Sequence, residues 1–75
     1  MPELRKVSGK DAIKALERLG FSQVRQRGSH VILKKSTPTG SVGCVVPLHK
    51  EIKIGTLHGI LKLAKIEPEE FLKHL

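Results

Sequence analysis

Three consecutive β-strands are predicted by residues 21–47, FSQVRQRGSHVILKKSTPTGSVGCVVP. Only Gly28 and Ser29 separate the first of these strands from the β-rich apolar run at residues 31–33. A two-residue link that starts with glycine is typical of a type II′ hairpin turn, because its first position needs a positive φ. The first two strands are therefore expected to form an antiparallel hairpin.

The strands are expected over residues 21–27, 30–35 and 42–46. Residues 36–41 contain a proline and a glycine, which predict a second turn between the last two strands. Pro47 is expected to end the third strand, since proline has no N–H to donate to a β-ladder.

Helices are predicted on both sides of these strands. Ser8 is suited to cap a helix over residues 9–19, and Gly20 is suited to end it. A second helix is expected to start with Thr56 as its cap, and a short third helix is expected to start at Pro68. Helical spacing of apolar residues supports the first two helices: Ala12, Ile13, Leu16 and Leu19, then Leu57, Ile60, Leu61 and Ala64.

The predicted order is helix, three strands, helix and short helix. This order indicates an α+β fold, a single domain over residues 1–75 with a three-stranded antiparallel sheet and the helices on one face. With 39% hydrophobic residues, the chain can fill one thin core. The other face of the sheet would then be open to solvent.

Strand alternation predicts which side chains reach the open face. The opposite face has an apolar middle, with Val24, Val31 and Leu33 beside Ser22 and Gln26, so it is expected to face the core. The open face is expected to be cationic, provided that the hairpin register does not slip by one residue. In an unbroken hairpin it carries Phe21, Gln23, Arg25, Arg27, His30, Ile32 and Lys34.

The charge of the chain indicates a polyanionic ligand. The formal net charge is +7, from 14 Lys and Arg against 7 Asp and Glu. Nearly all the excess lies in residues 1–35, which favours contact with nucleic acid over the alternative of a merely solvated basic surface. Phe21 and Phe71 are the only aromatic residues, so the base-stacking platforms of general single-strand binders are not expected.

Cysteine and histidine usage excludes two common kinds of site. Cys44 is the only cysteine, so it cannot form an intramolecular disulfide, and its apolar surroundings predict a buried, inert thiol. The four histidines are scattered, so a zinc site is not expected. The sequence shows no signal peptide and no run of 18 apolar residues, which favours the cytoplasm and predicts no membrane contact.

His30 is the candidate catalytic residue, because histidine can accept and donate a proton near neutral pH. RNA cleavage without a metal needs a base for the 2′-hydroxyl, an acid for the leaving 5′ oxygen and cations for the phosphate. Arg25, Arg27 and Lys34 are candidates to bind phosphate, and His49 is a candidate second acid or base. The plainer alternative is that a histidine beside a turn only makes surface hydrogen bonds.

The turn residues Gly28 and Ser29 are expected to lie close to bound RNA. Ser29 could act as a nucleophile in principle. However, turn chemistry alone accounts for a serine at this position, and no partner base stands at a hydrolase spacing.

Five short pieces of the chain, in this order and at this total length, match a known pattern: Val7-Ser8-Gly9-Lys10, Leu19-Gly20-Phe21, Arg27-Gly28-Ser29-His30, Val46-Pro47-Leu48-His49 and Gly55-Thr56-Leu57 with Ile60-Leu61. With these pieces the chain resembles the HicA toxins, also called the YcfA-like family, over nearly its whole length.

The resemblance implies a fold similar to double-stranded RNA-binding domains and the activity of a metal-independent mRNA interferase that arrests translation and growth. The histidine of the family's Gly-Ser-His motif, which toxicity requires, matches His30. His49 matches the family position after the strand-ending proline. The resemblance also implies a HicB antitoxin that covers the active site, and no cofactor.

Two other functions fit the same sequence. The first is a non-catalytic module that binds double-stranded RNA by its shape and 2′-hydroxyls. Residues 55–59 open the second helix with little charge, which counts against such a module. The second is a protein-interaction domain whose open sheet face binds another chain, which is compatible with a toxin that an antitoxin covers.

Overall fold

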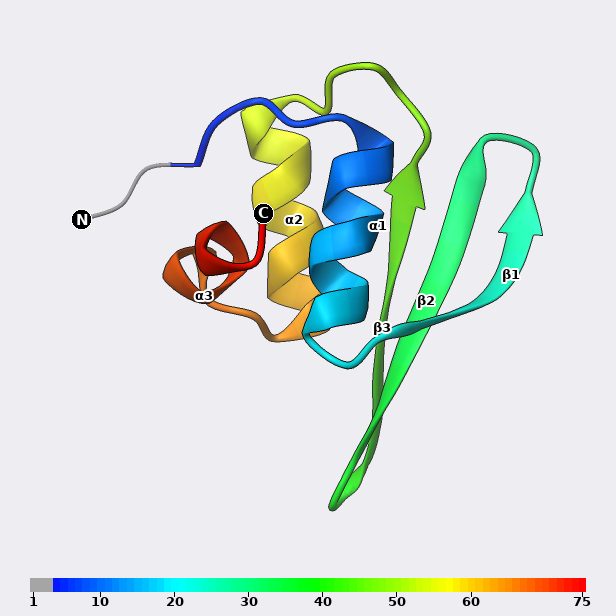
Figure 1. Cartoon of the computed structure of the whole chain (residues 1–75). Coiled ribbons are helices and arrows are strands. Elements are labelled where there is room, and N and C mark those ends of the chain that lie inside the picture. Colours follow the sequence, from blue (N-terminus) through cyan, green and yellow to red (C-terminus); the bar gives the residue numbers. More distant parts are fainter. Residues whose placement is uncertain (1–3) are drawn as a thin grey trace.

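The computed structural model describes residues 4–75 and confirms the predicted α+β architecture (Figure 1). A three-stranded antiparallel sheet of order β1-β2-β3 packs against helices on one face. The elements follow one another as α1 (Gly9–Arg18), β1 (Ser22–Arg27), β2 (His30–Thr37), β3 (Gly40–Pro47), α2 (Ile54–Ala64) and α3 (Pro68–Lys73).

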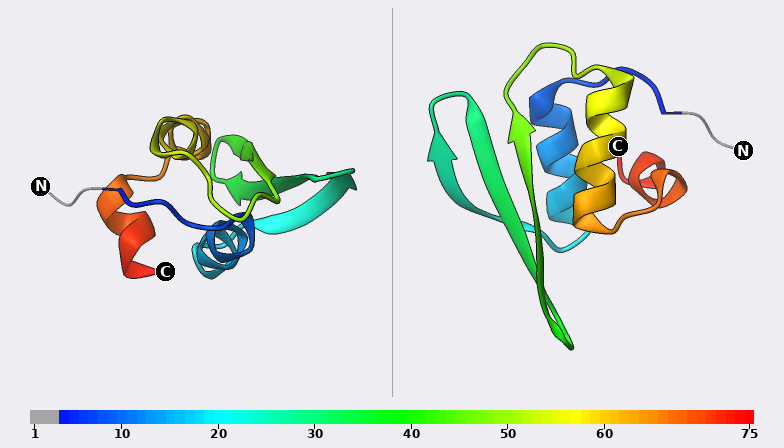
Figure 2. Two further views of the ribbon diagram at one scale, coloured as in Figure 1. Left: turned by 90° about the horizontal axis from the view of Figure 1, so that it is seen from above. Right: turned by 180° about the vertical axis from the view of Figure 1, so that it is seen from behind.

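The core lies between the helices and the inner face of the sheet. Phe71 of α3 is fully buried in the same cluster, and Leu72 and Leu75 pack against it. Figure 2 shows α1 and α2 side by side on the same side of the sheet. Most of the core side chains come from three places. In α1 they are Ala12, Ile13, Ala15 and Leu16; in the sheet, Val31, Leu33, Cys44 and Val46; and in α2, Leu57, Ile60, Leu61 and Ala64.

The start of α1 follows its sequence signals. The Ser8 hydroxyl accepts a hydrogen bond of 3.0 Å from the amide of Asp11, which satisfies one of the free N–H groups of the first turn. Past the end of the helix, Gly20 has a φ of 102°, a conformation that favours glycine.

The start of α2 differs from the prediction. The helix begins at Ile54, two residues before the expected cap Thr56, and Lys53 holds the N-cap position without a side-chain hydrogen bond. A tertiary contact lies directly before the helix: the amide of Ile52 donates to the carbonyl of Val7 at 2.7 Å. This bridge fixes the chain that leads into the helix, although it satisfies none of the free N–H groups of the first turn.

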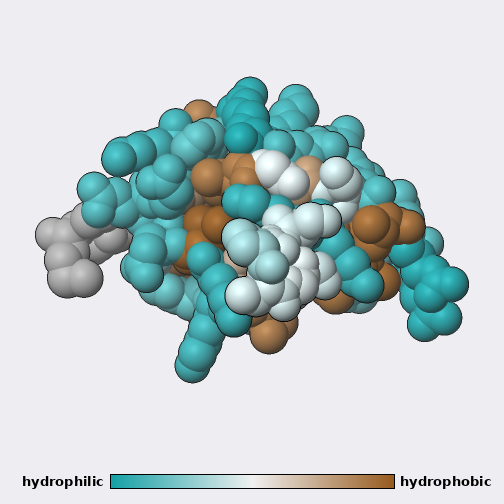
Figure 3. Space-filling model, turned by 90° about the horizontal axis from the view of Figure 1, so that it is seen from below, coloured by the Kyte–Doolittle hydropathy of each residue, from teal (hydrophilic) through white to brown (hydrophobic). Residues whose placement is uncertain are grey.

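The hairpin of β2 and β3 is longer than predicted. Thr37 pairs with Gly40, so only two residues form the turn instead of residues 36–41. The hairpin extends beyond the ends of the helices (Figures 1 and 2). Viewed from below, its tip forms a pale, weakly polar surface among hydrophilic side chains (Figure 3).

A β-bulge at Val24 changes the faces predicted for β1. Gln23 pairs with Leu33 and Arg25 with Ile32, so Val24 is an extra residue on its strand. Arg25 therefore lies on the open face, as predicted, whereas Gln23 lies on the face that packs against the helices.

The bulge corrects three further assignments. Val24 was expected to face the core but is 54% exposed, and Phe21 was expected on the open face but is only 3% exposed. Ser22 was expected on the core side, yet it pairs with Lys34 of the open face. Phe21 and Arg27 are six residues apart and would share a face in an unbroken strand. One extra residue lets the phenylalanine enter the core while the arginine stays outside.

Candidate functional site

Three segments that are distant in sequence meet at one end of the sheet. The amide of Leu48 donates a hydrogen bond of 2.7 Å to the carbonyl of Ser29, in the β1–β2 turn. The amide of Gly9, at the start of α1, donates one of 2.8 Å to the carbonyl of His49. These two bonds join the turn before His30, the segment after β3 and the first turn of α1.

Gly9 makes this approach possible. A Cβ at this position would collide with the carbonyl oxygen of Pro47 and lie 2.9 Å from Cα of Leu48. Both neighbours are backbone atoms, which cannot swing away as a flexible side chain can. Glycine therefore lets α1 lie directly against the segment that carries His49.

The β1–β2 turn has the predicted geometry at its first position. Gly28 has a φ of 57°, which a two-residue hairpin turn that starts with glycine requires. The side-chain amide of Gln26 donates a hydrogen bond of 3.0 Å to the carbonyl of Gly28. This bond ties the turn to β1, and so fixes the backbone that leads into His30.

His30 lies on the open face of the sheet, in a row with Arg27 on one side and Pro47 on the other. Its side chain is exposed, and the next residue, Val31, points into the core. Arg25 pairs with Ile32 in the following row, and Lys34 lies farther along the same face. The structure thus places His30 and the three predicted cations on one open surface.

His49 lies at the same end of the sheet but in different surroundings. It borders a hollow of about 260 Å³ beside the start of α1, together with Ser8, Lys10, Leu48 and Lys50. The bond between Leu48 and Ser29 brings the backbones of the two histidine segments together. His30 lies on the open face, whereas the hollow that His49 borders lies beside the start of α1.

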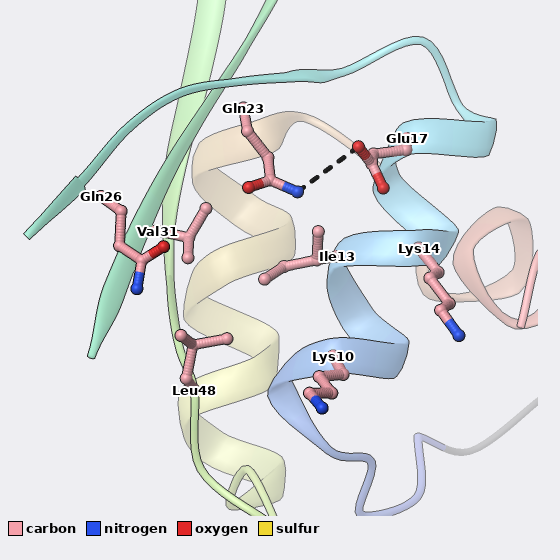
Figure 4. Close-up of a pocket in the computed structure, with 8 residues that line it drawn as sticks. All are labelled: Lys10, Ile13, Lys14, Glu17, Gln23, Gln26, Val31 and Leu48. Atoms are coloured by element: carbon pink, nitrogen blue, oxygen red, sulfur yellow. Dashed lines mark hydrogen bonds between the residues drawn. The ribbon is translucent and has the colours of Figure 1, made fainter. Parts of the chain in front are cut away.

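A second hollow, of about 220 Å³, opens between α1 and the β1–β2 hairpin (Figure 4). Lys10 and Leu48 line both hollows, so the two adjoin. The other lining residues are Ile13, Lys14, Glu17, Gln23, Gln26 and Val31.

The sequence did not indicate this second hollow. Gln23 was assigned to the open face, and Gln26 was assigned to the core side without a function. A polar Gln26 opposite the apolar Val31 is the one signal in the sequence that this part of the inner face is not fully covered.

The structure also shows the surroundings of the cysteine and of the possible metal ligands. Cys44 is buried as predicted, and the desolvation that burial causes raises the pKa of its thiol from 9.0 to about 11. Within residues 4–75, no three His, Cys, Asp or Glu side chains lie close enough together to hold a metal ion. In the same range, no helix has both the length and the apolar character needed to cross a membrane.

Residues 9–66 match the family model described as HicA toxin of bacterial toxin-antitoxin. The match covers all of the sheet, α1 and α2, and therefore every segment that meets at the site. A comparison with curated proteins gives no match.

Proposed function

The chain belongs to the HicA toxin family, the toxins of bacterial toxin–antitoxin systems, and on that premise we propose that it is an endoribonuclease that cleaves mRNA. Cleavage of mRNA would inhibit translation and growth. The observation that carries the proposal is the position of His30, exposed on an open sheet face in one row with Arg27. A proton-transfer group and a phosphate-binding group are thereby adjacent.

The reaction uses the nucleophile that RNA carries. A general base takes the proton of the 2′-hydroxyl, and the 2′ oxygen forms a new bond to phosphorus. The bond from phosphorus to the 5′ oxygen breaks, and a general acid protonates this leaving oxygen. The products are a 2′,3′-cyclic phosphate and a 5′-hydroxyl. His30 fills one of the two proton-transfer roles, and His49 is the candidate for the other.

Cations on the open face hold the substrate in this proposal. Arg27 is the nearest to His30 in the sheet register, and Arg25 and Lys34 continue the face along the strands. Arginine binds phosphate through two parallel N–H groups, which also stabilises the charge that develops as the new bond forms. The turn residues Gly28 and Ser29 lie beside this row and would contact the ribose-phosphate chain.

Incubating the purified protein with a long unstructured RNA in EDTA tests the activity. We expect fragments that end in a 2′,3′-cyclic phosphate and begin with a 5′-hydroxyl. A folded protein that binds duplex RNA tightly and leaves every RNA intact would instead establish the non-catalytic double-stranded RNA-binding module.

The partner proposed for this toxin is a HicB-like antitoxin, and the proposed compartment is the cytoplasm. No helix of residues 4–75 lies over the open face, and the apolar residues Ile32 and Val45 of this face pair in the row next to His30. A protein that covers this face would block the site and bury those residues. Coexpression with the product of the neighbouring gene should raise the melting temperature of the toxin, because a ligand that binds only the folded state stabilises it.

A further inference from the structure

We propose that the hollow between α1 and the β1–β2 hairpin binds one unpaired nucleobase that carries an exocyclic amino group. The base would belong to the RNA segment held at His30, so this inference rests on the proposed function. It assigns to the hollow a role in choosing the RNA sequence, which the open face with its phosphate-binding cations cannot supply.

The size and floor of the hollow suit one planar ring system. Its volume is about 220 Å³, below the roughly 300–1,000 Å³ of pockets that hold drug-sized ligands. Ile13 of α1 and Val31 of β2 point into it from opposite sides, and Leu48 closes one end (Figure 4). Ile13 and Val31 are only 6% and 2% exposed, so they form an apolar floor on which one face of a base can lie without an aromatic side chain, and neither phenylalanine lines the hollow.

The polar groups of the hollow favour hydrogen-bond donors on the ligand. The carboxylate of Glu17 can only accept hydrogen bonds when ionised. Gln26 gives one N–H to the carbonyl of Gly28, which leaves its side-chain oxygen free to accept. Gln23 donates to Glu17 at 3.5 Å, a long and weak bond that a ligand can replace. Adenine, cytosine and guanine each have an amino group to donate, whereas uracil has none.

The charges at the rim decide which part of a nucleotide enters. Lys10 of α1 lies at the edge of the hollow, and Lys14 follows one turn later with its ammonium group turned away from it (Figure 4). Both charges attract the phosphate chain to this side of the hollow. Glu17 repels a phosphate that would move inward. A nucleotide therefore fits with its phosphate at the lysines and its base inside.

The hollow is close to His30 along both strands. Gln26 precedes Arg27 in β1, and Val31 follows His30 in β2, so the hollow and His30 flank the same turn on opposite faces of the sheet. A single strand can pass around the Gly28–Ser29 turn and turn one base inward. Unpaired RNA allows this, because its bases can leave the stack and be read at their edges, whereas bases in a duplex cannot.

Nuclear magnetic resonance provides a test that does not depend on cleavage. The chain has two glutamines and no asparagine, so Gln23 and Gln26 give the only side-chain amide signals of this type. The probes are 2′-O-methyl tetranucleotides of adenine, cytosine or uracil, which lack the nucleophilic hydroxyl. We expect both amide signals to shift with the adenine and cytosine probes. The uracil probe should bind about fivefold more weakly, the loss of roughly one hydrogen bond.

Two variants and a matched control sharpen the result. Glu17→Gln removes the carboxylate and should reduce the discrimination between cytosine and uracil to less than about twofold, since an amide can donate to uracil as well as accept from cytosine. Gln26→Ala should weaken the binding of all three probes. Glu69→Gln makes the same chemical change on α3, far from the hollow in the fold, and should alter nothing.

Three results would overturn the base-binding role. One is the absence of amide shifts with any probe, and another is an equal response to uracil. The third is a shift of these signals only when the antitoxin is added, which would make the hollow a protein-docking site. If the amide signals move as expected but the protein leaves cleavable RNA intact, the proposed nuclease activity fails and the base-binding site stands.

Discussion

The backbone amide of Leu48 donates a hydrogen bond of 2.7 Å to the carbonyl oxygen of Ser29. Ser29 directly precedes His30, and Leu48 directly precedes His49. This bond continues the pairing of β2 with β3 past its last ladder pair, His30 with Pro47. It therefore fixes the backbones of the two histidine segments relative to each other.

This bond predicts slow hydrogen exchange at the Leu48 amide. The Leu48 side chain is exposed, so exposure alone would suggest fast exchange. We expect its amide to exchange at least about tenfold more slowly than that of Lys50 in the next loop, since a bonded amide must open before it can exchange. Exchange measured by NMR at both residues checks this, and equal rates would mean that the contact does not persist in solution.

The close approach of α1 to the segment after β3 predicts a large effect at Gly9. Gly9→Ala should lower the free energy of unfolding by about 1–3 kcal/mol, because the added methyl group collides with the backbone at Pro47 and Leu48. It should also displace His49, whose carbonyl accepts the amide of Gly9. Urea unfolding measures the loss of stability, and the chemical shifts of His49 report its displacement.

Gly59 in α2 is the matched control for that substitution. A Cβ at Gly59 would meet nothing within 4 Å, and the residue is exposed inside the helix. Gly59→Ala should therefore raise the free energy of unfolding by about 0.5–1 kcal/mol, the intrinsic helix preference for alanine. If the two variants changed the free energy of unfolding by similar amounts, the close contact at Gly9 would not contribute to stability.

Local signals made the helices and the topology predictable. The cap at Ser8 and the spacing of apolar residues in α1 and α2 act within a few residues, so they can be read from the sequence. The two-residue turn at Gly28 likewise follows from what its first position requires.

The faces of β1 could not be predicted, because the bulge at Val24 depends on the partner strand. Valine favours a strand whichever face it lies on, and no residue near Val24 indicates a β-bulge. In an unbroken strand Phe21 and Arg27 would share one face, although burial stabilises the phenylalanine and the arginine charge needs solvent. The bulge places Phe21 in the core and leaves Arg27 exposed. Sequence alternation assumes an unbroken strand, so it missed both this change of face and the hollow that Gln23 lines.

The cations of the open face predict a dependence of RNA binding on salt. Arg27→Ala should weaken binding of a single-stranded RNA and lower the slope of log affinity against log salt concentration by about 0.7, the value for one lost phosphate contact. Lys62→Ala on α2 removes the same charge from a different surface and should leave the slope unchanged. Fluorescence anisotropy at several salt concentrations measures the slopes of both variants. If the slope for Arg27→Ala equalled that of wild type, Arg27 would not contact the RNA phosphates.

Burial of Cys44 predicts a loss of stability in alkali. Burial raises the pKa of its thiol from the ordinary 9.0 to about 11, so above pH 9 the unfolded chain releases the proton first. Between pH 9 and 11 the free energy of unfolding should fall by as much as about 1.4 kcal/mol per pH unit from this group. Cys44→Ala should show a smaller fall in urea unfolding at pH 8 and pH 10, and parallel falls would contradict the assignment.

If His30 carries a proton in RNA cleavage, its removal should abolish cutting, whereas the loss of another exposed histidine should not. Wild type, His30→Ala and His58→Ala are incubated with the same unstructured RNA in EDTA, and initial cleavage rates are measured. His58 is exposed on α2 and controls for the loss of a surface histidine. We expect His30→Ala to lose at least about a hundredfold in rate, the usual contribution of a general acid or base, while RNA binding and the fold persist. Cleavage by His30→Ala at the rate of wild type would show that His30 carries no proton in the reaction.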